Sequence, residues 1–175
     1  MLSPAQRLEE CLTSRVVLVA IGRRGHGDDG AGPAVLDQVV GKISARCIDA
    51  GTAPERHLGE AAEGGPEAIL LVDAVDFGGA PGEIAVFGAE ELPSRLATTH
   101  DASLQLVMRY LEGESGARVV LAGIQPACIT PGEPLSASVE AGVRALSDLL
   151  QARLQVERET GPVATGAQPT EGRGS

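Results

Sequence analysis

The sequence predicts an α/β fold of three layers, in which a mainly parallel, twisted sheet of about five strands, one of them antiparallel, is flanked by helices. Two observations lead to this fold class. Short apolar runs alternate along the chain with segments whose apolar residues recur at helical spacing. The runs at 16–21 and 68–73 are apolar almost throughout, which is typical of parallel strands buried on both faces.

Each element follows from its own pattern. The helix that starts near His100 is indicated by apolar residues at helical spacing, namely Leu104, Val107, Met108 and Leu111. The connection at 77–82 is too short for a crossover helix, so the strand after it should run antiparallel to its predecessor. The expected elements are, in order, helix 4–12, strand 16–21, helix 32–40, strands 45–50, 68–73 and 83–87, helix 100–111, strand 118–124 and helix 135–154.

The chain is expected to form one domain with a tail. With 175 residues, 43% of them hydrophobic, it is long enough for one well-buried core, which we assign to residues 1–154. Residues 155–175 have no apolar periodicity and contain many Gly, Pro and Thr residues. We expect this C-terminal tail to be disordered and assign it no function.

Composition restricts the classes of partner. The formal net charge is −10, only 2% of the residues are aromatic and there is no Trp, so both charge and stacking disfavour nucleic acid. The N-terminal residues lack the basic start and apolar core of an export signal, and no apolar run approaches the roughly 20 residues that span a bilayer. Three cysteines without a Cys-x-x-Cys pair fit a reducing compartment. We expect a cytoplasmic protein without membrane or nucleic-acid partners.

A glycine-rich loop, Gly-Arg-Arg-Gly-His-Gly-Asp-Asp-Gly-Ala-Gly-Pro at 22–33, follows the first strand. Its glycines leave little bulk around Asp28 and Asp29, so a metal ion or a peptide can approach closely. Asp and Gly are also common turn and N-cap formers, which leaves a purely structural role open. A phosphate site fits less well because two aspartates repel phosphate and the glycines do not follow G-x-G-x-x-G, although Arg23 and Arg24 could offset that repulsion.

Two further segments carry candidate site residues. Asp73 ends the apolar run at 68–73, which places it at the carboxyl edge of the predicted sheet. His100 stands at the predicted start of a helix. Because ligands of open α/β sheets collect outside the carboxyl ends of the strands, both residues can converge with Asp29. His26, in the glycine loop, is expected to be a solvated loop residue rather than part of the site.

These segments carry a family resemblance. The chain resembles the hydrogenase maturation proteases, and within them the endopeptidases of the formate-hydrogenlyase type, also called the hydrogenase 3 type. The likeness runs in order from about residue 16 to about residue 150. Its motifs are Gly-Asp-Asp-Gly-Ala-Gly-Pro at 27–33, Ile-Asp-Ala-Gly-Thr-Ala-Pro-Glu at 48–55, Leu-Val-Asp-Ala at 71–74, Pro-Gly-Glu-Ile at 81–84, Thr-Thr-His at 98–100 and Ala-Gly-Ile-Gln-Pro at 122–126.

The resemblance implies an endopeptidase that removes a short C-terminal extension from a [NiFe] hydrogenase large-subunit precursor after nickel insertion, so that the new C-terminus closes the metal centre. It implies that Asp29, Asp73 and His100 are the metal-binding and catalytic positions and that the precursor presents the nickel. We expect the protein to be a monomer. Arg23 stands where family members usually have Asn, so the entry of the loop departs from the family pattern.

The chemistry of these side chains agrees with that site. Two carboxylates and an imidazole suit Ni, Zn or Mn, so the isolated protein could also hold another divalent metal. A bound metal can act as catalyst, as in metallopeptidases, or only recognise the substrate, in which case a free aspartate serves as general base, as in aspartic-type endopeptidases. Asp28 is the first candidate base and Asp76 the second, and each could instead be a turn or capping acid. The alternative function is a non-catalytic escort module that binds nickel or a phosphate ligand.

Overall fold

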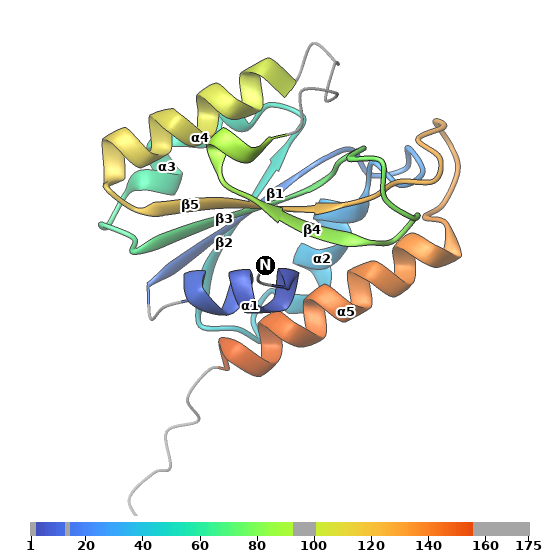
Figure 1. The fold of residues 1–175 in the computed structure, drawn as a ribbon, viewed down its shortest axis with the longest axis horizontal. Helices are drawn as coiled ribbons and strands as arrows, with labels where there is room; N and C mark the ends of the chain where they lie inside the picture. The colour runs from blue at the N-terminus through green and yellow to red at the C-terminus, as the bar shows by residue number, and fades with distance from the viewer. Residues whose placement is uncertain (1–2, 13–14, 93–100, 156–175) are drawn as a thin grey trace, which may run out of the picture.

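A five-stranded sheet forms the centre of the molecule (Figure 1). The computed structural model describes residues 3–12, 15–92 and 101–155, with the backbone alone at 101–103. The strands lie in the order β2-β1-β3-β5-β4. Their bounds are β1 Val16–Ile21, β2 Ala45–Gly51, β3 Ala68–Ala74, β4 Ile84–Phe87 and β5 Arg118–Ile124.

Four of these strands run parallel, and β4, an outermost strand of the sheet, runs antiparallel to its neighbour β5. The predicted direction of β4 relative to β3 is therefore confirmed. The two strands are not neighbours, however, because β5 is paired between them. The carboxyl ends of β1, β2, β3 and β5 consequently share one edge of the sheet, which we call the active edge.

Helices cover both faces of the sheet. Figure 1 shows α1, α2 and α5 on one face and α3 and α4 on the other. The helices are α1 Pro4–Cys11, α2 Ala31–Val39, α3 Leu58–Ala62, α4 Asp101–Ser115 and α5 Ala137–Arg153, with short 3₁₀ turns at Pro54–His57 and Ala89–Glu91. The predicted three-layer α/β class is thus confirmed. In the described part of the chain, none of the helices combines the length and the apolar character that crossing a bilayer demands.

The strand alternation explains why two separate cores form. In β1, Val16, Leu18 and Ala20 face α1, α2 and α5, whereas the residues between them face α3 and α4. All six residues of β1 are buried. Because both faces of the central strands are covered, an apolar residue is favoured at every position, which is the uninterrupted pattern that the sequence shows.

The predicted boundaries agree with the structure to within a few residues, as at β1 and β5, which are predicted without error. Two short elements were not predicted, the 3₁₀ turn at Pro54–His57 and helix α3. Each is about one turn long, which is too short to show helical periodicity in the sequence. Leu154 and Gln155 still pair with Ser44 and Ile43, so order extends to the first residue of the predicted tail. Residues 156–175 lie outside the described residues, and their predicted disorder stays a prediction.

Candidate active site

Close backbone packing at Gly22 brings Asp29 to the end of β1. Gly22 has φ +129, and a Cβ atom there would lie 2.0 Å from the carbonyl oxygen of Asp29. The backbone N–H of the next residue, Arg23, donates to that carbonyl at 3.1 Å and to Asp29 Oδ2 at 3.0 Å. Any side chain at position 22 would therefore push Asp29 away from the strand that precedes it.

Gly32 brings the end of β3 to the same place. A Cβ atom at Gly32 would lie 2.2 Å from the carbonyl oxygen of Ile21 and 2.5 Å from that of Val72. The first turn of α2 therefore rests directly on the last residues of both strands. Asp73 follows Val72, one residue beyond the paired Ala20 and Val72. The structure thus brings two of the predicted site residues, Asp29 and Asp73, to the active edge near the end of β1.

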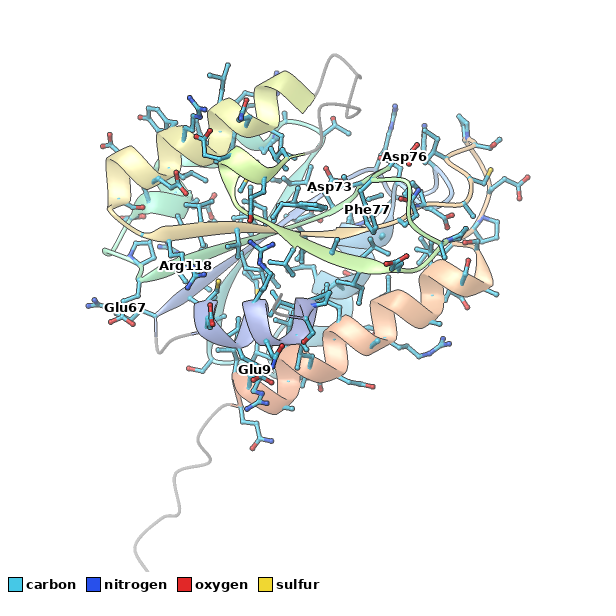
Figure 2. All side chains as sticks on the ribbon, viewed as in Figure 1. Glu9, Glu67, Asp73, Asp76, Phe77 and Arg118 are labelled. Atoms are coloured by element: carbon cyan, nitrogen blue, oxygen red, sulfur yellow. The ribbon has the colours of Figure 1, made fainter. Side chains whose placement is uncertain are left out.

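Both carboxylates are half-buried rather than sealed in the core. Asp73 Oδ1 accepts a hydrogen bond from the Ala74 N–H at 2.8 Å. Figure 2 shows Asp73 and Asp76 at one end of the sheet and Glu67 and Arg118 at the opposite end. Two partly solvated carboxylates at one edge can bind a cation or hold a water molecule against a peptide.

The third predicted site residue, His100, lies outside the described residues. Helix α4 begins at the next residue, Asp101, and its N-terminal end is on the same side of the molecule as the active edge (Figure 1). Among the residues that the structure describes, no three His, Cys, Asp or Glu side chains are grouped as a metal site. The three-residue site therefore stays a prediction, of which two members share one edge.

Asp28 differs sharply from its neighbour Asp29. It is fully buried, with 0% of its surface exposed. Its Oδ2 accepts hydrogen bonds from the backbone N–H groups of Ala127 at 2.8 Å and Cys128 at 2.9 Å, and from Ser136 Oγ at 2.9 Å. Its Oδ1 accepts from the Ser136 N–H at 2.7 Å. These contacts favour the structural alternative that the sequence left open, because all four donors come from the connection between β5 and α5.

The hydrogen bonds also keep Asp28 ionised. Burial, the largest single influence, raises the pKa of Asp28, but the hydrogen bonds from Ser136, Cys128 and Ala127 together outweigh it and hold the pKa below its usual range. A carboxylate that is fully buried, acidic and already bonded to four donors is a poor acceptor for a proton from water. As a candidate base, Asp28 is therefore disfavoured by its environment.

Asp76, the second candidate base, is exposed, but its carboxylate is also engaged. Asp76 Oδ1 accepts hydrogen bonds from Gln125 Nε2 at 3.0 Å and from the Gly78 N–H at 3.1 Å. The sequence marks Gln125 only as part of the Ala-Gly-Ile-Gln-Pro motif and does not single out Ser136. The sequence signal for Ser136 is a serine directly before a helix, and the structure shows that it caps α5 by accepting from the Val139 N–H.

The two arginines of the loop have distinct environments. Arg24 forms ion pairs with Asp37 and Asp49, so its charge is already balanced by carboxylates and the phosphate alternative loses support. The Arg23 side chain is exposed, and its backbone N–H makes the hydrogen bonds to Asp29. Because any residue except proline supplies that N–H, the departure from the usual Asn leaves the loop entry intact. His26 is half-buried rather than solvated, and among the described residues its Nδ1 has no hydrogen-bond partner.

Comparison with known proteins places this geometry in a family. The family model of the hydrogenase maturation proteases, HycI, matches residues 37–152. The hydrogenase 3 maturation protease of Escherichia coli K12 is 30% identical over 154 residues, which cover 82% of this chain and 98% of that protein. These matches confirm the likeness to the hydrogenase 3 type.

Solved structures agree with the sequence matches. The crystal structure of the [NiFe] hydrogenase maturation protease HycI from Thermococcus kodakarensis KOD1 superposes with a TM-score of 0.78 at 27% identity, covering 85% of this chain and 98% of that one. The solution structure of the endopeptidase HycI from Escherichia coli gives a TM-score of 0.69 at 29% identity, with 83% and 99% covered. The chain therefore belongs to the hydrogenase maturation protease family and is a peptidase.

Proposed function

We propose that this protein removes the C-terminal extension of a nickel-loaded [NiFe] hydrogenase large-subunit precursor. The observation that carries the proposal is the convergence of Asp29 and Asp73 at the end of β1, enforced by the close backbone contacts of Gly22 and Gly32. Family membership makes the chain a peptidase, and this edge carries two partly solvated carboxylates, those of Asp29 and Asp73. The similar proteins are described as hydrogenase maturation proteases, one of them for hydrogenase 3, which supports a precursor of that type.

Asp29, Asp73 and His100 are the residues that we expect to engage the nickel of the precursor. Two oxygen donors and one nitrogen donor form a borderline set that suits Ni²⁺. Three protein ligands leave coordination positions for atoms of the precursor, so the nickel acts as part of the substrate. In the isolated protein the same donor set would accept another divalent cation, such as Zn²⁺ or Mn²⁺.

Cleavage requires a water molecule to be activated against the scissile carbonyl group. In one route the nickel polarises that carbonyl or acidifies the water. In the other route, of the aspartic type, a carboxylate of Asp29 or Asp73 takes the proton of the water and the amine of the leaving peptide receives one. Asp28 is unsuited to this task because it is buried and saturated with hydrogen bonds.

We further propose that the protein acts as a monomer in the cytoplasm. The precursor must be reached before it is exported or docked at a membrane, and three cysteines without a Cys-x-x-Cys pair fit a reducing compartment. An acidic chain of net charge −10 also attracts any basic patch on the precursor.

The test is cleavage of a purified nickel-loaded large-subunit precursor, followed by intact mass. Asp29→Asn and Asp73→Asn should each lower the cleavage rate by about 100-fold or more, the range expected when an acid–base or charge-stabilising group is lost. Asp148→Asn, on the exposed face of α5, is the matched control and should cleave within about twofold of wild type. A wild-type protein that binds the loaded precursor without shortening it would instead indicate the escort function.

A further inference from the structure

We propose that the connection between β5 and α5, residues 125–136, is the positioning element of the active edge. It holds the loop of Asp29 through Asp28 and the exit of Asp73 through Asp76, so both candidate bases act as hydrogen-bond anchors rather than as bases. The inference rests on the proposed function for its cleavage readout, and an amide-exchange readout tests it separately.

Gln125 is the residue that holds the exit of β3. It is buried, with 6% of its surface exposed, although it is polar and lies at the end of a strand. Its Oε1 accepts from the backbone N–H groups of Phe77 at 2.9 Å and Gly79 at 3.1 Å. Its Nε2 donates to Asp76 Oδ1 at 3.0 Å and to the Pro126 carbonyl at 3.4 Å. The side-chain amide thus uses both donors and both acceptor sites, which fixes its orientation and that of the loop around it.

The far end of the loop between β3 and β4, residues 75–83, is also fixed. The Gln125 backbone donates to the Glu83 carbonyl at 2.9 Å and accepts from the Gly82 N–H at 2.8 Å. Gly82, at φ +83, packs so tightly on the first turn of α5 that a Cβ atom would lie 2.1 Å from the Ser138 carbonyl oxygen. The Phe77 ring stacks edge-on against Phe87 at 5.8 Å between centroids. The chain that leaves Asp73 is therefore pinned at both ends.

The loop of Asp29 is pinned by the same connection. Besides the four hydrogen bonds to the Asp28 carboxylate, the Asp28 N–H donates to the Cys128 carbonyl at 2.8 Å and the Gly27 N–H donates to the Glu133 carbonyl at 2.9 Å. A Cβ atom at Gly27 would lie 2.5 Å from the Cys128 carbonyl oxygen. Because one segment holds both loops, a shift of that segment would move both predicted ligands together.

An anchor and a base respond differently to conservative substitution. In Asp76→Asn, the Oδ1 atom still accepts from Gln125 Nε2 and the Gly78 N–H, whereas no carboxylate remains to take a proton. In Asp76→Ala, both hydrogen bonds are lost. We therefore expect Asp76→Asn to cleave the nickel-loaded precursor at a rate within about fivefold of wild type. Asp76→Ala should lose about tenfold to 100-fold in kcat with KM nearly unchanged, because its catalytic groups are misplaced while the precursor still binds.

Gln125→Met, which fills a similar volume without hydrogen bonds, gives the independent readout. Hydrogen exchange at the Phe77 and Gly79 amides should accelerate at least about tenfold in this variant, because their shared acceptor is gone. Asp76→Asn should leave both amides protected. These exchange rates test the anchoring even where no precursor is cut.

Equal losses of kcat in Asp76→Asn and Asp76→Ala would overturn the inference, because they would make Asp76 a base. Unchanged exchange at Phe77 and Gly79 in Gln125→Met would overturn it as well, because the amide would then hold nothing in place. A wild-type protein that fails to cut the loaded precursor would refute the proposed function, and the exchange rates would still decide the anchoring. If Gln125→Met does not fold, the kcat of the two Asp76 variants decides the question alone.

Discussion

Replacing Asp28 by Asn tests how much of the fold depends on the anchor beneath the active edge. The wild-type carboxylate accepts four hydrogen bonds in a fully buried position, three of them at Oδ2 and one at Oδ1. An Asn side chain can place its oxygen at only one of the two positions. With that oxygen facing the three donors, its NH₂ group lies against the Ser136 N–H, and two donors then meet without an acceptor.

The magnitude follows from these contacts. A buried donor left without an acceptor costs about 1–3 kcal/mol, and hydrogen bonds to a charged acceptor are worth about 1 kcal/mol more than neutral ones. Three bonds lose about 1 kcal/mol each and the orphaned donor costs about 1–3 kcal/mol, so we expect Asp28→Asn to lower the free energy of unfolding by about 4–6 kcal/mol. Urea denaturation followed by circular dichroism measures this, since the chain has no Trp for fluorescence.

Asp29→Asn is the matched control, one residue away and chemically the same change. Its side chain is half-buried and accepts one hydrogen bond from the Arg23 N–H, so the loss should not exceed about 1 kcal/mol. We thus expect Asp28→Asn to lose mainly free energy of unfolding and Asp29→Asn to lose mainly cleavage rate. Equal denaturation midpoints for wild type and Asp28→Asn, with equal slopes, would refute the reasoning.

Three further predictions concern pH, charge and the tail. The pKa of Asp28 is lower in the folded protein than its unfolded value of about 3.9, so the stabilisation from this carboxylate is fully present above that pH and is lost as pH falls through the folded pKa. The difference in unfolding free energy between wild type and Asp28→Asn should therefore be constant at neutral pH and narrow as pH falls below about 4. A difference that stays constant in acid would contradict this. Replacing Arg23 and Arg24 by Ala removes two exposed ion pairs, so the free energy of unfolding should fall by no more than about 1 kcal/mol. Metal affinity, measured by calorimetry, should be retained. If the wild type binds a nucleotide and the double variant does not, the phosphate alternative regains support. Truncation after Val156 should leave the melting temperature within about 2 °C of the wild-type value, because the described contacts of the C-terminus end at Gln155. A larger drop would mean that the tail packs on the domain.

The parts of the fold that sequence patterns predict well are those where burial leaves no alternative. Strands β1 and β3 are covered on both faces, so their apolar runs are continuous and their positions follow directly. The place of β4 in the sheet was not predictable in the same way. Its short connection fixes its direction, but its pairing with β5 depends on contacts with a strand that comes later in the chain.

The site shows the same division. Sequence spacing placed Asp29 and Asp73 at one edge, because strand ends converge in a parallel sheet. Spacing alone could not separate Asp28 from Asp29, since two adjacent aspartates in a glycine loop are identical by pattern, and only the family resemblance assigned the metal to Asp29. Their difference comes from donors about one hundred residues away, at Ala127 and Ser136. Long-range contacts of this kind leave no local signal, which is also why the sequence does not reveal the contacts of Gln125 with the loop after β3.

The most direct test of the proposed function is the intact mass of a large-subunit precursor incubated with this protein. Four reactions are compared, with nickel-loaded or nickel-free precursor and with wild type or His100→Gln, a variant of similar polarity that lacks a ring nitrogen ligand. We predict loss of the C-terminal extension only when wild type meets the nickel-loaded precursor. Cleavage of the loaded precursor by His100→Gln at the wild-type rate would contradict the three-residue site, and an unshortened precursor in all four reactions would contradict the proposed function itself.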